Sequence, residues 1–270
     1  PGDFPGGDSK QNIGFLTKKD LPALEKCYNR ICDKTHGMFR RCKYEMIRLA
    51  GPKFKIVGYR QGKTVNGFIV FEYKMDKGEN MLLHDMNITE MFYENREVLG
   101  QLLTWLNTQA DQIRYINLGN VDDSFHFIPI DPRDNSEMLV AGINHQVNRQ
   151  GIGMMYRILD IKSFFRQLKK HNFNKQSCHL KLNIGDSFYK GNAGTYTLKF
   201  DKGKATISKE NNCDAEISMD IAEFSSMVMG AVTFDKLYEY KLAEISDNAF
   251  IKTVSDIFRT PSKPYCVTQF

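Results

Sequence analysis

A strict alternation of apolar and polar residues runs through the second half of the chain and constrains its fold more than any other feature. Successive side chains of a β-strand point to opposite faces, so this pattern indicates strands with one buried face. The apolar members form four groups: Leu180, Leu182 and Ile184; Tyr196, Leu198 and Phe200; Ala205 and Ile207; and Ala215, Ile217, Met219 and Ile221. We therefore expect half-buried antiparallel strands here.

Helical patterns flank these strands. The spacing of apolar residues and of capping residues predicts a helix after Asp160, a helix over 222–229 that Gly230 ends, and a last helix over 250–258. A further strand is expected at 155–159. One sheet with helices laid over it is the most economical architecture for this half.

The first half mixes helices and strands. We expect the following elements: a helix from the capping box of Thr17 and Asp20 to Gly37, a helix over 40–49, a hairpin of strands 54–60 and 65–75, a strand over 81–87, a helix over 90–112, and a strand over 115–118. The chain as a whole is thus predicted to be α+β. Its parts are a Gly- and Pro-rich linker or strap at 1–14, a first domain at 15–153 and a second domain at 154–270.

Composition excludes several classes of protein. Because no stretch approaches 18 uninterrupted apolar residues, we expect no membrane span. The 37 basic residues are interleaved with 32 acidic ones, so we expect no nucleic-acid partner. The 6 cysteines are scattered without a CxxC pair, and this predicts reduced thiols in a cytoplasmic protein.

Short motifs outside the C-terminal tail favour structural explanations. Residues 148–153 resemble the Q/R-x-x-G-x-G/A loop that holds coenzyme pyrophosphate in GNAT acetyltransferases, but a strand pattern follows where a helix would be needed, so we expect a plain connection. His84 and Asp85 are adjacent in a predicted strand and would point to opposite faces. Lys169, Lys170 and His171 close a predicted helix, where cations favour the negative end of its dipole. No metal-ligand spacing is present.

The C-terminal tail is unusually apolar. Pro264, Tyr265, Cys266, Val267 and Phe270 follow a strongly amphipathic helix, whereas most chain ends are polar and mobile. Such a tail either covers core surface or holds the terminal carboxylate of Phe270 in a fixed place. The sequence by itself leaves both explanations open.

Several segments together resemble the Eis (enhanced intracellular survival) family of N-acetyltransferases. In the second half they are 155–161, 194–200 with Gly203, 215–221 and 264–270, which are similar to the sterol-carrier-protein-like domain that closes that family's chains. In the first half they are 21–24, 37–41 and 57–59, which resemble the family's central GNAT-like domain, a fold without a working coenzyme site. The resemblance covers nearly the whole chain.

The resemblance implies acetyl transfer from acetyl-CoA to an amine of an aminoglycoside-like or polyamine-like acceptor, by direct attack. In that family the last residue's carboxylate reaches into the active site as a base, and the matching position is Phe270. The family's first domain, which binds the coenzyme, has no counterpart in this sequence. We therefore expect that a coenzyme domain precedes Pro1 in the parent protein, that this chain alone binds no acetyl-CoA, and that the parent is a homo-oligomer.

Two alternatives stay open. The parent can lack a coenzyme domain altogether, in which case the chain is a non-enzymatic module that encloses a lipid or another apolar ligand in the manner of a sterol carrier. A scaffold that only holds an oligomer together is the other alternative. A Q/R-x-x-G-x-G/A loop upstream of Pro1 would favour the enzyme.

Overall fold

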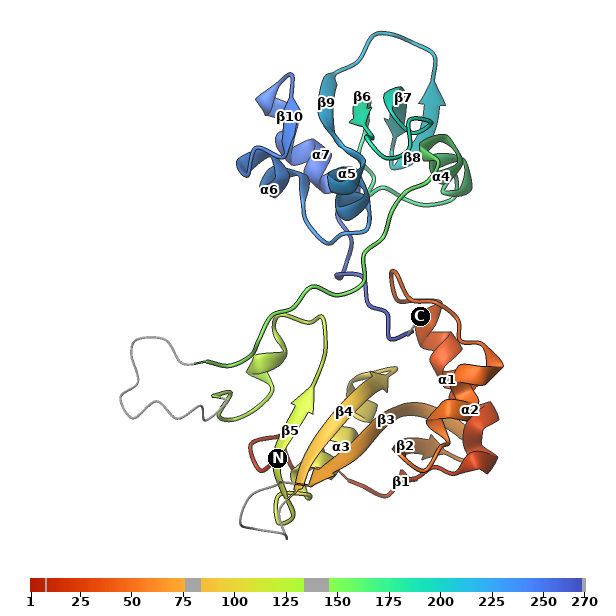
Figure 1. The fold of residues 1–270 in the computed structure, drawn as a ribbon, viewed down its shortest axis with the longest axis vertical. Coiled ribbons are helices and arrows are strands. Elements are labelled where there is room, and N and C mark those ends of the chain that lie inside the picture. Colours follow the sequence, from red (N-terminus) through yellow and green to blue (C-terminus); the bar gives the residue numbers. More distant parts are fainter. Residues whose placement is uncertain (8, 76–83, 134–145, 269–270) are drawn as a thin grey trace. The chain divides into compact units, whose positions relative to one another are not determined.

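The protein forms two compact units, each with one five-stranded sheet. The computed structural model describes residues 1–7, 9–75, 84–133 and 146–268. Unit 1 comprises Pro1–Ile152 together with Tyr265–Phe270, and unit 2 comprises Gly153–Pro264 (Figure 1). Whether the predicted domains 15–153 and 154–270 are functional domains stays a prediction. The compact units have a different C-terminal boundary, because Tyr265–Phe270 belongs to unit 1.

The sheet of unit 1 has the strand order β1-β2-β3-β4-β5. Neighbouring strands are antiparallel except β4 and β5, which are parallel. The bounds are β1 Ile13–Phe15, β2 Lys55–Gln61, β3 Thr64–Met75, β4 His84–Tyr93 and β5 Ile113–Leu118. The predicted hairpin is confirmed as β2 and β3, and its turn contains Gly62 at a φ of +61°.

Helices cover both faces of this sheet. On one face lie α1 (Leu21–Cys32) and α2 (Lys43–Leu49), and on the other lies α3 (Arg96–Asn107) (Figure 1). Strand β3 therefore buries neighbouring residues in different cores, Phe68 with α1 and Ile69 with α3. This explains why its sequence is a continuous apolar run without alternation.

The expectation of a helix over 90–112 is wrong at both ends. Strand β4 continues to Tyr93, because Met91 and Phe92 pair with Ile69 and Phe68 of β3 and bury their side chains on opposite faces of the sheet. Helix α3 begins only after Asn95, whose side chain accepts a hydrogen bond from the Val98 amide at 3.1 Å. The predicted strand over 81–87 lies outside the described residues for 81–83, and its remainder is the start of β4.

The N-terminal segment is held against α3. The Asn107 side-chain amide donates to the carbonyl oxygens of Gly2 at 3.0 Å and of Phe4 at 2.7 Å. Phe4 is buried in the same core as α3, and β1 extends the sheet beside β2. Much of the stretch predicted as a linker or strap thus contacts the core of unit 1.

The sheet of unit 2 has the order β10-β9-β6-β7-β8. Its bounds are β6 Cys178–Gly185, β7 Gly194–Asp201, β8 Lys204–Ser208, β9 Ala215–Asp220 and β10 Ala243–Ile245. The alternation predicted β6, β7, β8 and β9 correctly but not β10, and β6 and β9 are parallel rather than antiparallel. Leu180, Leu182 and Ile184 all point into the core, while the residues between them are partly exposed.

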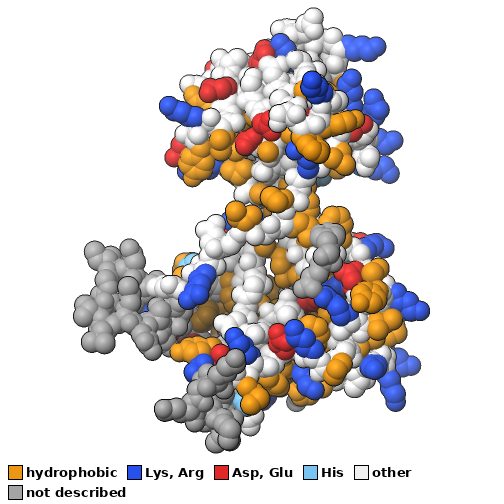
Figure 2. Space-filling model, viewed as in Figure 1, with side chains coloured by type: hydrophobic (Ala, Val, Ile, Leu, Met, Phe, Trp, Pro, Cys, Tyr) orange, Lys and Arg blue, Asp and Glu red, His pale blue; other side chains and the backbone are white. Residues whose placement is uncertain are grey.

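Four helices cover the apolar face of this sheet: α4 (Ile161–Gln167), α5 (Ile221–Val228), α6 (Phe234–Glu239) and α7 (Ile251–Phe258). The predicted caps are present, since Asp160 accepts from the Ser163 amide at 2.8 Å and Asp220 from the Ala222 amide at 3.0 Å. Gly230 follows the C-cap residue of α5 at a φ of +72° and ends the helix, as expected. Over the face shown in Figure 2, Lys and Arg side chains are interspersed with Asp and Glu.

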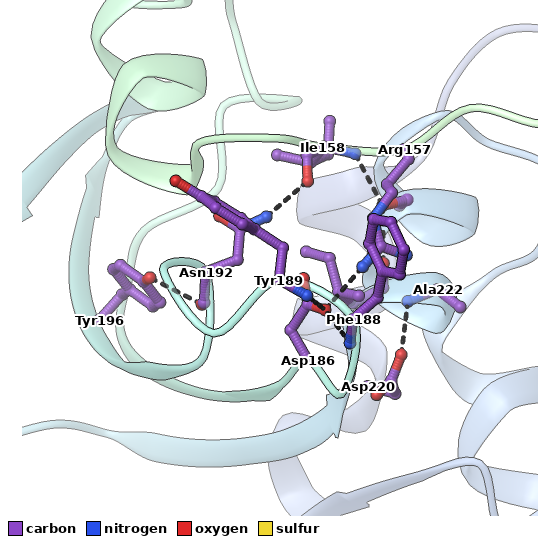
Figure 3. Close-up of polar contacts among 11 residues, drawn as sticks. Arg157, Ile158, Asp186, Phe188, Tyr189, Asn192, Tyr196, Asp220 and Ala222 are labelled. Atoms are coloured by element: carbon purple, nitrogen blue, oxygen red, sulfur yellow. Dashed lines mark hydrogen bonds and ion pairs between the residues drawn. The ribbon is translucent and has the colours of Figure 1, made fainter.

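The strand expected at 155–159 is wrong. Residues 151–158 have no regular secondary structure. Both backbone groups of Ile158 bond to side chains instead, its amide to Ser225 Oγ at 3.0 Å and its carbonyl oxygen to Asn192 Nδ2 at 2.7 Å (Figure 3). Met155 and Leu159 are exposed, so their apolar character does not reflect burial.

Candidate functional site

The described part of the C-terminal tail is anchored in unit 1. The Tyr265 amide donates to the His36 carbonyl oxygen at 3.0 Å. The Tyr265 ring lies 5.8 Å from the Phe92 ring, measured between centroids, and Val267 packs against the same core between the sheet and α1. The last described residue is Thr268, so Phe270, the predicted catalytic position, lies outside the described residues.

A buried ion pair lies beside this tail. Arg41 Nη2 is 2.5 Å from Glu90 Oε1, and only 2% and 5% of the two side chains are exposed. The Arg41 guanidinium also lies 4.0 Å from the centre of the Tyr28 ring, a cation–π contact. Tyr28 in turn donates its hydroxyl to the Phe39 carbonyl oxygen at 2.8 Å. The chain before α2 is therefore fixed to α1 and to β4 by polar contacts within a mostly apolar core.

Burial controls the acid–base properties of these groups. It raises the pKa of Tyr28 to about 12, with Arg41 opposing the effect. It also raises the pKa of Tyr265, to which the nearby Glu90 carboxylate adds. Burial likewise raises the pKa of Glu90, and Arg41 opposes it. Both phenols keep their protons at neutral pH, so these side chains support the tail and are poorly suited to carry protons themselves.

The sequence does not predict this pair. Its apolar pattern places Glu90 in a helix, and Arg41 belongs only to the segment 37–41 that carries the family resemblance. The sequence does contain one indication of the pair, because Glu90 is a charged residue at a buried position of the otherwise apolar end of β4. A buried carboxylate needs a cationic or hydrogen-bonding partner nearby.

The junction between β4 and α3 does not fit a coenzyme pyrophosphate. Such a group needs free backbone N–H groups at a helix N-terminus and no negative charge nearby. Here the Val98 amide already bonds to Asn95. Glu94 precedes the helix, bonded to Arg30 at 2.6 Å, and Glu97 lies in its first turn. The Asn95 side chain thus occupies a backbone donor that a phosphate would need, and the Glu97 carboxylate adds a negative charge in the first turn.

The other motifs serve structural purposes where they are described. Residues 148–153 are exposed and irregular, and the segment that follows is irregular rather than a strand. Asp85 lies 3.4 Å from Arg114. Asp122 accepts from the Ser124 amide at 2.9 Å, which makes it part of a turn.

Three general properties follow for the described part of the chain. It contains no cluster of three or more His, Cys, Asp or Glu side chains that could hold a metal ion. None of its helices is long and apolar enough to cross a membrane. All six cysteines are free thiols, and burial raises the pKa of Cys27 to about 12 and that of Cys178 to about 11. Those two thiols are therefore poor nucleophiles.

Three solved structures that are similar to nearly the whole chain are described as a GCN5-related N-acetyltransferase, as Eis1 and as a probable N-acyltransferase. A GCN5-related N-acetyltransferase from Anabaena variabilis superimposes with a TM-score of 0.74 at 15% identity, over 100% of this chain and 66% of its own. Eis1 from Mycobacterium abscessus gives 0.68 at 16%, over 99% and 65%. A probable N-acyltransferase from Enterococcus faecalis gives 0.71 at 16%, over 99% and 64%. The chain thus spans just under two thirds of each of these proteins.

Sequence comparison adds one family. Residues 161–267 match the family model described as a sterol carrier protein domain. No curated protein matches the chain. The predicted fold class is confirmed: the protein is α+β, with a GNAT-like mixed α/β domain followed by a sterol-carrier-protein-like sheet that carries helices on one face. At identities this low, the structural likeness describes the fold alone.

Proposed function

We propose that this chain is the C-terminal two-domain portion of an acetyl-CoA-dependent N-acetyltransferase similar to the Eis family. Its fold supports the proposal, since the similar structures include a GCN5-related N-acetyltransferase, Eis1 and a probable N-acyltransferase, and each is longer than this chain. The acceptor is an amine of an aminoglycoside-like or polyamine-like molecule. The parent enzyme is a cytoplasmic homo-oligomer.

The anchored tail is the observation that carries the proposal. Tyr265 is packed against Phe92 and bonded to His36, five residues before the terminal carboxylate of Phe270. A terminal carboxylate on a mobile tail would spend little time in any one place. Anchoring lowers the entropy that must be lost when the carboxylate is positioned against a substrate.

The proposed chemistry is direct transfer. The terminal carboxylate accepts a proton from the cationic acceptor, and the resulting neutral amine nitrogen attacks the thioester carbonyl carbon. An N–C bond forms, the C–S bond breaks to release the coenzyme A thiolate, and the second proton leaves the nitrogen and neutralises that thiolate. An α-carboxylate has an ordinary pKa of about 3.3 to 3.7, so it is a weak base in water. Desolvation near the Phe270 ring would raise its basicity, and its charge would attract the cationic acceptor before the proton leaves.

The coenzyme site is proposed to lie in a domain upstream of Pro1. The junction between β4 and α3 supports this assignment because Asn95 caps the helix N-terminus and Glu97 lies in its first turn, where a pyrophosphate would have to bind. This chain then supplies one wall of the acceptor pocket and the terminal carboxylate.

The test uses the full-length gene product. It is assayed for release of free coenzyme A from acetyl-CoA with a panel of aminoglycosides and polyamines. We expect turnover, and we expect two residues added after Phe270 to lower kcat strongly with acetyl-CoA binding unchanged. The same two residues inserted between Asn211 and Asn212, in an exposed loop, are the control. The absence of an upstream Q/R-x-x-G-x-G/A loop would contradict the enzyme, and full turnover of the extended protein would contradict a catalytic terminus.

The alternative function is a binding module for a lipid or another apolar ligand. The match of residues 161–267 to a sterol carrier protein domain favours it. The interior of unit 2 gives little support to a ligand in its core, because five phenylalanine rings already pack together between the sheet and the helices. The rings are those of Phe165, Phe173, Phe200, Phe224 and Phe258, and their contacting pairs have centroids 5.2 to 6.4 Å apart. A ligand would need another place on this unit.

A further inference from the structure

A groove of about 780 Å³ lies between α4 and the strands β7 and β8 of unit 2. Ligand sites for small organic molecules commonly measure about 300 to 1,000 Å³. Its walls include Lys162, Arg166 and Lys169 on the helix side, and Tyr196, Ile207 and Lys209 on the strand side. We call these six residues the cationic groove.

The helix side presents three cations in a row. Residues 162, 166 and 169 follow one another at intervals of four and three, which places them on one face of a helix. Lys169 closes the segment just beyond Gln167, the last residue of α4. The sequence alone suggested that this lysine only complements the helix dipole, whereas the structure places it on the wall of a groove.

These charges are not neutralised by close carboxylates. Among the described residues, Lys162, Arg166, Lys169 and Lys209 take part in none of the ion pairs within 4.0 Å. Hydrogen bonds from Ser163 and, to a smaller extent, the charge of Arg166 hold the pKa of the Asp160 carboxyl below its ordinary value. Its carboxylate is already bonded to the amide and the hydroxyl of Ser163, at 2.8 and 2.6 Å. A partly enclosed site with this charge attracts anions.

The strand side supplies apolar and aromatic surface. Ile207 is 38% exposed although its neighbours on the same face of the sheet are buried, and Ala205 lies next to it along the strand face. The Tyr196 hydroxyl donates to the Asn192 carbonyl oxygen at 2.8 Å, which fixes the ring (Figure 3). Lys162 Nζ lies 5.9 Å from the centre of that ring. A ligand here would contact cations at one end and carbon surface at the other.

We infer that the cationic groove binds a small organic anion with an apolar body, of the class of alkyl phosphates and alkyl carboxylates. The cations of α4 and Lys209 hold the anionic head, and Ile207 with the Tyr196 ring contacts the apolar body. This inference does not depend on the proposed acetyl transfer, because its measurements concern binding alone.

Isothermal titration of the full chain with octyl phosphate, octanoate, octanol and octylamine tests the inference. We expect at least one of the two anions to bind at least about tenfold more tightly than octanol or octylamine, and its affinity to fall as salt is raised. Whichever anion binds more tightly identifies the preferred head group. Equal binding of octanol, or binding of inorganic phosphate as tight as that of octyl phosphate, would overturn the inference.

Variants locate the site. Arg166→Glu with Lys169→Glu should weaken anion binding by about tenfold or more, and Lys209→Glu should weaken it from the opposite wall. Lys190→Glu, at an exposed residue outside the groove, makes the same change of charge as Lys209→Glu and is the control. Circular dichroism verifies that each variant is folded. If the groove variants bind as tightly as Lys190→Glu, or if ligand-induced amide shifts fall outside residues 162–169 and 195–209, the groove is not the site.

Discussion

Arg41 and Glu90 join the helix layer of unit 1 to its sheet through a buried ion pair of 2.5 Å. Arg41 lies just before α2, and Glu90 is in the middle of β4. One further atom of each, Arg41 Nη1 and Glu90 Oε2, has no hydrogen-bond partner among the described residues. Because both groups pay a desolvation cost, each depends on the other for compensation.

Removing one partner of this pair should therefore be more harmful than removing both. Glu90→Leu leaves the Arg41 charge buried and uncompensated, and we expect it to lower the free energy of unfolding of unit 1 by about 3–5 kcal/mol. Adding Arg41→Met should recover most of that loss. Urea unfolding followed by the fluorescence of Trp105 measures this, because Trp105 is the single tryptophan of the chain and lies on α3.

A surface pair provides the matched control for this experiment. Lys53 and Glu72 lie 3.2 Å apart, with the lysine 66% exposed, so Lys53→Met should cost no more than about 1 kcal/mol. If the double variant is as unstable as Glu90→Leu, the loss comes from packing and not from an unpaired charge.

The tail should stabilise unit 1 through Tyr265. Tyr265→Ala removes a partly buried ring beside Phe92, and we expect a loss of about 1–3 kcal/mol in the Trp105 transition. Tyr240→Ala makes the same chemical change at a residue that is 60% exposed, and it should leave that transition unchanged. An unaltered transition in Tyr265→Ala would mean that the tail rests on unit 1 without stabilising it.

Local patterns were sufficient for most of the fold. Alternation predicted β6 to β9, and capping residues such as Asp160 and Gly230 marked helix ends correctly. The failures were places where the same residues serve another purpose. Met91 and Phe92 are both apolar because β4 is covered on both of its faces. Two consecutive apolar residues also fit the pattern of a helix, which is why the sequence predicts one there. Ile158 belongs to no strand, since side chains bond its backbone.

The candidate site was less accessible from the sequence. The apolar tail was visible, and its anchoring followed from Tyr265 and Val267. The pairing of Arg41 with Glu90 was not visible, because their contact depends on how α2 and β4 come together and periodicity records only local neighbours. The cationic groove could be predicted only in part. The spacing of Lys162, Arg166 and Lys169 was present in the sequence, but the facing strands were needed to make a groove.

The backbone of Ile158 offers a test of side-chain support in unit 2. Asn192→Ala leaves the Ile158 carbonyl oxygen without its partner, and we expect a loss of about 1–3 kcal/mol. Hydrogen exchange over residues 178–185 and 194–201 measures it, because β6 and β7 pair in the middle of the sheet. Asn211→Ala, at an exposed loop residue, should change nothing. If the two variants exchange alike, Asn192 does not hold the segment in place.

Asp186 should make unit 2 sensitive to acid. Its side chain is fully buried, and the Tyr189 amide at 2.7 Å, with Arg157 at 2.6 Å and the Phe188 amide at 3.0 Å, holds the pKa of the carboxyl below its ordinary value of 3.8 (Figure 3). A depressed pKa in the folded state means that the ionised form stabilises the fold above pH 3.8. This contribution is lost as the pH falls through the lowered pKa.

Asp186→Asn removes the negative charge but keeps the size of the side chain, and its amide oxygen can still accept hydrogen bonds from the two backbone N–H groups. At pH 6 the variant should unfold at a lower urea concentration than the wild type, as judged by far-ultraviolet circular dichroism. As the pH falls from 3.8 to the lowered pKa, the unfolded wild type binds a proton before the folded form does, so its advantage shrinks and the two midpoints should converge. Asp201→Asn, at an exposed position of β7, should follow the wild type at every pH. A difference between Asp186→Asn and wild type that stays constant from pH 6 to pH 2.5 would show that ionised Asp186 does not stabilise this loop.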